Sequence, residues 1–123
     1  MLRVSNGPKI MEKKFNLKTG KLGEEIAKDY LENKGFKILG QNCKTRFAEI
    51  DLIVQKGKEK ILVEVRTRRG NLFGTPEESL TKNKLRKLRL NARAIGAERI
   101  DAVCIVLGQN DAVEKLEHYE NIC

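Results

Sequence analysis

Two apolar segments with strand-like sequence, residues 48–54 and 61–66, are separated by six polar residues that include Gly57. Runs of aliphatic and β-branched residues on either side of a glycine-containing turn are typical of a β-hairpin. If Gly57 and Lys58 form a two-residue turn, with glycine at the first position, the strand register places Asp51 opposite Glu64. This hairpin therefore constrains both the fold and the choice of candidate site.

The two-residue repeat of a strand predicts which side chains share a face. One face is expected to carry Glu49, Asp51, Glu64 and Arg66, and the other Ile50, Leu52, Val63 and Val65. Two carboxylates directly opposite each other repel, and a bound cation would relieve that repulsion. In the alternative interpretation the acids are simply solvated, and Glu49 with Arg66 forms an ordinary cross-strand salt bridge.

Carboxylate oxygens on neighbouring strands are ligands that suit Mg²⁺, which keeps several waters and bridges to substrate phosphate. A metal ion of this kind can activate a water molecule for phosphodiester hydrolysis. The only histidine, His118, lies in a segment without clear periodicity and is assigned no role. The sequence therefore predicts a carboxylate site for Mg²⁺ or Mn²⁺ made by Asp51 and Glu64, without a histidine ligand.

Further elements are expected on both sides of the hairpin. Apolar spacing predicts helices over 18–34 and 79–97, with Thr19 as an N-cap and Gly35 as the stop of the first. A short strand is expected from Phe36 toward Arg46, a loop over 68–78, and a buried strand over 100–107 in the middle of the sheet. The tail, 112–123, fits an edge strand or a short helix.

The chain has 123 residues, enough for one domain. Residues 1–17 are expected to be a flexible basic segment, and 18–123 a single domain. No membrane span is predicted, because no apolar run approaches the length that crossing a bilayer requires. Three cysteines without a CxxC pair indicate neither a disulfide framework nor a zinc cluster, so we expect a reducing cytoplasm as the location.

Lys and Arg outnumber Asp and Glu by 25 to 17, and this net charge of +8 favours a polyanionic partner such as nucleic acid. In the second predicted helix, four cations at four- and three-residue spacing form one stripe, and further cations lie nearby. The stripe can follow a phosphate backbone, although a solvated helix face is the simpler alternative. The predicted nucleic-acid-binding residues are Lys82, Lys84, Arg86, Arg89, Arg93, Arg68 and Arg69.

Several short motifs occur in a characteristic order: Gly20-Lys-Leu-Gly23-Glu24-Glu-Ile-Ala27, Tyr30-Leu31, Gly35, Ala48-Glu49-Ile50-Asp51-Leu52-Ile53 and Val63-Glu64-Val65-Arg66-Thr67-Arg68. On these motifs the chain resembles the uncharacterised bacterial YraN family, from about Gly20 to Val106. That family is placed by similarity in the PD-(D/E)XK nuclease superfamily, beside Holliday-junction resolvases and restriction endonucleases. The resemblance implies an α/β fold with an αβββαβ core and a mixed central sheet flanked by helices.

Carried over residue by residue, the resemblance implies that Glu24 is the acid of the first helix and that Asp51 and Glu64 are the metal ligands. It places Arg66 where the superfamily has its catalytic lysine. Arginine keeps its proton, so it can neutralise a phosphate but is a poor proton shuttle. Ala48 also stands where the family usually has glycine.

The leading hypothesis is a Mg²⁺-dependent endonuclease acting on branched or structured DNA, with Glu24, Asp51, Glu64 and Arg66 as its catalytic residues. The alternative is a nuclease-fold nucleic-acid-binding module whose catalysis is impaired by Arg66. A protein-interaction role with incidental charge is a third interpretation. A symmetric homodimer is suggested by analogy with resolvases.

Overall fold

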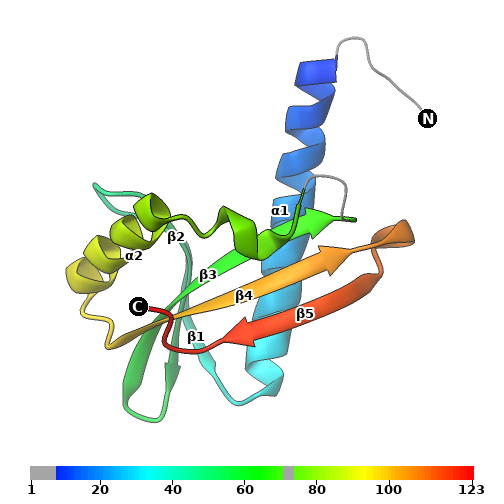
Figure 1. The fold of residues 1–123 in the computed structure, drawn as a ribbon. Helices are drawn as coiled ribbons and strands as arrows, with labels where there is room; N and C mark the ends of the chain where they lie inside the picture. The colour runs from blue at the N-terminus through cyan, green and yellow to red at the C-terminus, as the bar shows by residue number, and fades with distance from the viewer. Residues whose placement is uncertain (1–7, 71–73) are drawn as a thin grey trace.

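A computed structural model describes residues 8–70 and 74–123, with side chains described from Lys18 onward. Five strands form one mixed sheet in the order β1-β2-β3-β4-β5, with β3 and β4 parallel and all other neighbours antiparallel. Helices α1 (Pro8–Asn33) and α2 (Lys82–Ile95) lie on opposite faces of this sheet (Figure 1). The strands are β1 Lys37–Lys44, β2 Glu49–Lys56, β3 Glu59–Arg69, β4 Arg99–Leu107 and β5 Val113–Tyr119.

The order α1-β1-β2-β3-α2-β4 confirms the predicted α/β fold class and its αβββαβ core. It is compatible with a restriction endonuclease-like architecture, to which β5 adds an antiparallel edge strand. Of the two structures expected for the tail, the edge strand is therefore the one formed. Within the described residues, neither helix is long and apolar enough to cross a membrane.

Helix α1 begins earlier than predicted. It starts at Pro8, a residue suited to the first helical position because its missing N–H would have no intrahelical partner there. The helix predicted over 18–34 is thus extended back to Pro8, and residues 1–7 lie outside the described part; the flexibility expected of residues 1–17 stays a prediction. Thr19 is inside the helix and buried, so its prediction as N-cap is also wrong.

The end of α1 is as predicted. Gly35 has a positive φ of 92°, and its N–H donates to the carbonyl of Glu32 at 3.0 Å. The N–H of Phe36 donates to the carbonyl of Leu31 at 3.0 Å, which completes a Schellman motif. Phe36 and Leu31 are both buried in the core on the α1 side of the sheet, so the same motif ends the helix and directs the chain into β1.

Helix α2 begins later than predicted, at Lys82 instead of Ser79. Residues Pro76–Ser79 form a separate 3₁₀ turn, η1, which is closed by a capping box between Thr75 and Glu78. Thr81 then caps α2 by accepting from the N–H of Lys84, and Gly96 ends it in the left-handed conformation. Strand β3 continues to Arg69, so the predicted loop starts later than expected; residues 71–73 lie outside the described part.

Two apolar clusters separate the faces of the sheet. The cluster on the α1 side joins that helix to β2, β3 and β4, and the cluster on the α2 side is smaller. Strand β4 is buried along nearly its whole length between β3 and β5, which confirms the prediction of an interior strand. The β2–β3 hairpin is therefore packed on both faces, by α1 on one side and by α2 on the other.

Candidate metal and nucleic-acid site

The β2–β3 hairpin has the predicted register. Gly57 has a positive φ at the turn, and the ladder runs from Lys56 opposite Glu59 to Leu52 opposite Val63. The next pair in that register is Asp51 with Glu64, but regular pairing stops before it. Instead the N–H of Val65 donates to Asp51 Oδ2 at 2.9 Å, so a side chain takes the place of the strand's backbone acceptor. The hairpin thus opens where the two acids lie.

The alternation of side chains along β2 changes at the same point. Leu52 belongs to the apolar cluster on the α1 side, whereas Ile50 belongs to the cluster on the α2 side. The prediction that Ile50 shares a face with Leu52, Val63 and Val65 is therefore wrong for Ile50. Strand β2 turns relative to β3 once it leaves the ladder, and Asp51 lies at the residue where this turn occurs.

Glu64 is a buried charged residue with a relative exposure of 1%. Its Oε2 accepts from Arg66 Nη1 at 3.0 Å and lies 3.2 Å from Lys84 Nζ. Its Oε1 is buried and has no hydrogen-bond partner among the described residues. A buried carboxylate oxygen without a partner is costly in a folded protein. Glu64 thus holds Oε2 with two cations, and its carboxyl also lies within side-chain hydrogen-bond reach of Asp51.

The electrostatics of Asp51 show how close the three predicted acids lie. Burial and the Glu64 carboxylate raise the pKa of Asp51 to about 8, against a smaller lowering by the Val65 N–H, and Glu24 adds to the increase. Glu24 lies on α1, and Asn42 Nδ2 of β1 donates to its Oε1 at 2.9 Å. Glu64 and, more weakly, Glu24 thus lie near enough to Asp51 to act on its charge, and their joint role as a site stays a prediction.

Arg66 is held firmly beside Glu64. Its Nε donates to Ser79 Oγ at 2.6 Å, and Ser79 in turn donates to the carbonyl of Pro76 in η1. The predicted salt bridge between Arg66 and Glu49 is absent from the described residues, because β2 and β3 no longer pair at that point. Glu49 is exposed and lies opposite Lys44 of β1.

The predicted cations of α2 divide into two groups. Four of them are exposed along the helix and form what we call the α2 cation row: Lys82, Arg86, Arg89 and Arg93. Lys84 is instead partly buried, with its ammonium group on Glu64. The sequence placed Lys84 with the phosphate-binding residues, and its position next to the carboxylates was missed because the angle between α2 and the sheet is a tertiary feature.

Arg68 and Arg69 lie at the end of β3. Arg69 is engaged within the molecule: its Nε donates to Thr19 Oγ1 at 3.3 Å, and its Nη2 lies 2.8 Å from Asp111 Oδ1. Arg68 donates to the carbonyl of Thr67, and its Nε is buried. These contacts tie β3 to α1 and to the β4–β5 connection, and nucleic-acid binding by both arginines stays a prediction.

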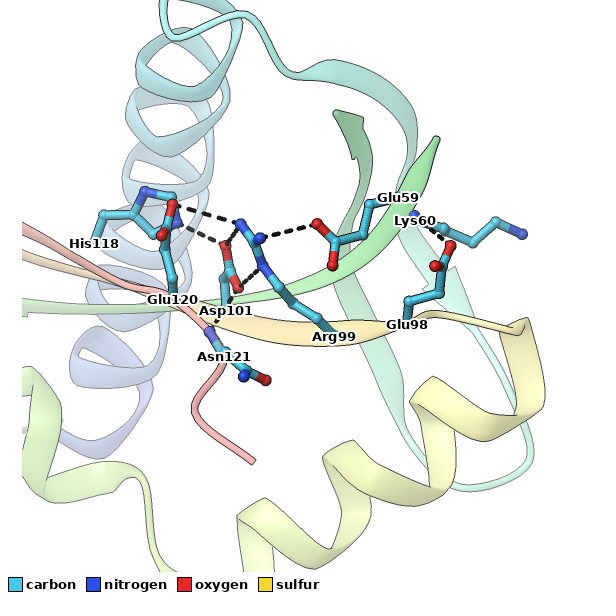
Figure 2. Close-up of polar contacts among 8 residues, drawn as sticks. All are labelled: Glu59, Lys60, Glu98, Arg99, Asp101, His118, Glu120 and Asn121. Atoms are coloured by element: carbon cyan, nitrogen blue, oxygen red, sulfur yellow. Dashed lines mark hydrogen bonds and ion pairs between the residues drawn. The ribbon is translucent and has the colours of Figure 1, made fainter. Parts of the chain in front are cut away.

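A second polar cluster, which sequence reasoning missed, surrounds Asp101 (Figure 2). Arg99 makes a bidentate contact with the fully buried Asp101: its Nε and Nη2 lie 2.8 and 3.1 Å from the two carboxylate oxygens. His118 Nε2 and the N–H of Asn121 also contact this carboxylate, at 2.9 and 3.0 Å. The available signal was an acid inside the apolar run of β4.

Asp101, His118 and Glu120 bring ligand-type atoms within 4.8 Å of one another. However, Arg99 lies among them and contacts both Asp101 and Glu120 (Figure 2). A divalent cation would have to approach this guanidinium, and both Asp101 oxygens already accept hydrogen bonds. The cluster is therefore best explained as a structural link between β4 and the C-terminal residues.

Comparison of the sequence with known proteins identifies a family. The model of a family described as "Uncharacterised protein family UPF0102" matches residues 23–105. A UPF0102 protein of Pelotomaculum thermopropionicum is 39% identical over 110 residues, covering 83% of this chain and 92% of the relative. One from Alkaliphilus oremlandii is 36% identical over 117 residues, covering 87% and 98%. The matched residues include the C-terminal part of α1, the whole of α2 and all three predicted acids. The chain therefore belongs to the UPF0102 family.

Proposed function

We propose that this protein is a divalent-metal-dependent endonuclease that hydrolyses phosphodiester bonds in structured nucleic acid, DNA in the first place. The observation that carries the proposal is the pairing of Asp51 and Glu64 at the open end of the hairpin. One of these carboxyls has a strongly raised pKa and the other has a buried oxygen without a partner. A bound cation would favour the ionised form of Asp51 and give the Glu64 oxygen a partner, so both features support a cation site.

The residues present fit Mg²⁺ or Mn²⁺. Asp51 and Glu64 offer hard carboxylate oxygens, Glu24 adds negative charge nearby, and neither histidine nor cysteine is part of the group. When bound, such an ion acts as a Lewis acid on phosphate and lowers the pKa of a bound water. The carboxylates of Asp51 and Glu64 would hold the ion, with the Val65 N–H fixing the orientation of Asp51.

Two cations complete the site, and their chemistry differs. Arg66 is fixed by Glu64 and Ser79, and its guanidinium keeps its charge, so it is suited to orienting Glu64 and neutralising phosphate. Lys84 reaches the same Glu64 oxygen from α2. An ammonium group can release a proton where a guanidinium cannot, so we assign to Lys84 the proton-transfer role that Arg66 cannot fill.

The α2 cation row supports a polyanionic substrate. Its side chains are exposed on the outward face of α2, on the other side of the helix from Lys84, so phosphates bound along the row would lie across α2 from the acidic site. Attraction of this kind is independent of base sequence and falls with salt concentration.

A second candidate function is nucleic-acid binding without cleavage. The specific observation in its favour is that Arg66, which the resemblance aligns with the superfamily lysine, is engaged in two intramolecular contacts. In that case the carboxylates would keep a structural ion or a proton, and the basic surface alone would act on nucleic acid.

The test is a cleavage assay on linear, forked and four-way DNA with Mg²⁺ or Mn²⁺, alongside calorimetric titration of Mn²⁺. The native chain is compared with Asp51→Asn and Glu64→Gln, and with Glu25→Gln as an exposed acid of α1. We expect cutting and metal binding by the native and Glu25→Gln proteins only. Cleavage by Asp51→Asn at the native rate would overturn the site assignment; metal and DNA binding without cleavage would favour the second candidate.

A further inference from the structure

A pocket of about 630 Å³ lies between the β1–β2 turn and the last turns of α2. Its apolar wall includes Phe47, Leu90 and Ile95. Three cations also line it, namely Lys44, Arg46 and Arg93, and none of its lining residues is acidic. An apolar wall with a cationic lining matches a ligand that has a flat apolar part and a negative part, as a nucleotide has.

The wall formed by the turn is rigid. The buried amide of Asn91 accepts a short hydrogen bond from the Thr45 hydroxyl, and its Nδ2 donates to the carbonyl of Ala48 at 3.4 Å. The N–H of Phe47 donates to Thr45 Oγ1 at 3.0 Å. These bonds anchor the turn to α2, so the backbone that carries Phe47 is held in place and its ordering adds little to the cost of binding.

The position of the pocket connects it to the candidate site. Arg93, at its edge, is also the last member of the α2 cation row. The turn leads into β2, which begins at Glu49, so Phe47 and Asp51 are four residues and at most about 14 Å apart along the chain. A strand of nucleic acid bound along the row can therefore reach the pocket through Arg93.

We propose that this pocket binds an unpaired base of a nucleic-acid strand, with the adjoining phosphates on Lys44, Arg46 and Arg93. The base lies against Phe47, which Arg46 approaches at 5.1 Å from the ring centre. Aromatic and guanidinium groups stack with any base, so this contact selects strand structure and is tolerant of base sequence. The inference deepens the proposed function, on which it rests for its substrate: a duplex with an unpaired segment, as at a fork or flap.

Fluorescence anisotropy in EDTA tests this binding separately from cleavage and metal. The probes are a labelled DNA duplex and the same duplex with a short single-stranded extension. The native chain is expected to bind the extended duplex roughly tenfold more tightly, a preference of the size that one stacked base provides. Phe47→Ala should lose this preference and keep its affinity for the plain duplex, whereas Lys58→Ala, which removes a cation from the hairpin turn, should keep the preference.

A native chain without preference for the extension, or Phe47→Ala that retains it, would overturn the proposal. If Phe47→Ala lowered the affinity for both probes equally, the proposal would also be overturned, because the ring would then contribute only to the stability of the fold. A second measurement uses native protein only: a photoreactive 5-bromouracil in the extension should crosslink to the 44–47 turn or to residues 90–95. Crosslinks elsewhere would contradict it. Asp51→Asn should keep the preference for the extended duplex. A failure of the proposed cleavage would therefore not affect this binding result.

Discussion

The backbone N–H of Val65 donates to Asp51 Oδ2 at the residue where β2 and β3 stop pairing. A carboxylate thus replaces a backbone carbonyl as the acceptor, and the hairpin opens without leaving that buried N–H unsatisfied. The same bond orients Asp51 beside Glu64. Opening of the hairpin and convergence of the two acids are therefore one structural event.

The raised pKa of Asp51 makes the stability of the metal-free protein depend on pH. The unfolded chain releases this proton near pH 4, whereas the folded chain keeps it up to about pH 8. Folding is therefore penalised progressively as pH rises through that window. Urea unfolding in EDTA should show falling stability from pH 5 to 8 for the native chain.

Asp51→Asn should remove most of this pH dependence. Its Oδ1 can still accept from Val65, and it carries no charge beside Glu64, so we expect it to be about 1–2 kcal/mol more stable than native at pH 8. Native stability that stays flat between pH 5 and 8, or falls equally in Asp51→Asn, would contradict the assignment.

Lys84 should matter in a way that an exposed lysine elsewhere, such as Lys58 in the hairpin turn, does not. Lys84→Met removes both the ion pair with Glu64 and the exchangeable proton, so we expect cleavage to fall by roughly 100-fold or more. Lys84→Arg keeps the charge and should still lose most activity if proton transfer is its role. Full cleavage activity in Lys84→Arg would show that Lys84 only positions Glu64. Lys58→Met is the control for loss of a lysine elsewhere, and it should cleave at the native rate.

Gly23 is where α1 approaches β3 most closely. A Cβ on Gly23 would lie 1.8 Å from Thr67 Oγ1, so the helix would have to move away from the sheet. Gly23→Ala should destabilise the protein by about 1–3 kcal/mol. Gly20 in the same helix has no atom within 4 Å of such a Cβ, so Gly20→Ala should be neutral or stabilising. Thermal unfolding that ranks the two variants equally would contradict the packing.

Local chemistry made much of this fold predictable. The glycine turn at Gly57 fixed the hairpin register, and Gly35 ended α1 where expected, because both depend on a few neighbouring residues. The closeness of Asp51 to Glu64 was also predicted, from the hairpin register, whereas Glu24 was named from the family resemblance alone.

Tertiary features were the ones that sequence patterns missed. The turn of β2 that sends Ile50 to the opposite cluster depends on how β2 leaves the ladder. Lys84 looked like part of a solvated stripe because periodicity gives a helix face but not the angle at which the helix crosses the sheet. Asn91 did carry a signal, as a polar residue between Leu88 and Ala92 on the inward side of α2.

The α2 cation row predicts a specific dependence on salt. Arg89 is exposed, so Arg89→Ala should weaken DNA binding similarly for all sequences. The slope of log affinity against log salt concentration should become shallower by about 1, as for the loss of one phosphate contact. Anisotropy titrations at salt concentrations from about 50 to about 300 mM measure this slope. An unchanged slope would remove Arg89 from the interface.

The Asp101 cluster predicts a structural effect. Burial opposes ionisation of Asp101, but bonds from Arg99, Asn121 and His118 outweigh it and lower its pKa. Its contribution is therefore present above about pH 4 and is lost as pH falls through the folded-state value. Asp101→Asn should cost about 3 kcal/mol at pH 7, whereas Glu120→Gln, which alters an exposed contact, should cost less than about 1 kcal/mol. Equal losses in urea unfolding would contradict this account.

The most direct test of the central claim is crystallographic. Crystals soaked in Mn²⁺ should show anomalous density between the carboxylates of Asp51 and Glu64, with Glu64 Oε1 as a ligand, and none in crystals of Asp51→Asn. An ion found only at Asp101, His118 and Glu120, or no ion at Asp51 and Glu64 while Mn²⁺ is present in solution at millimolar concentration, would contradict it.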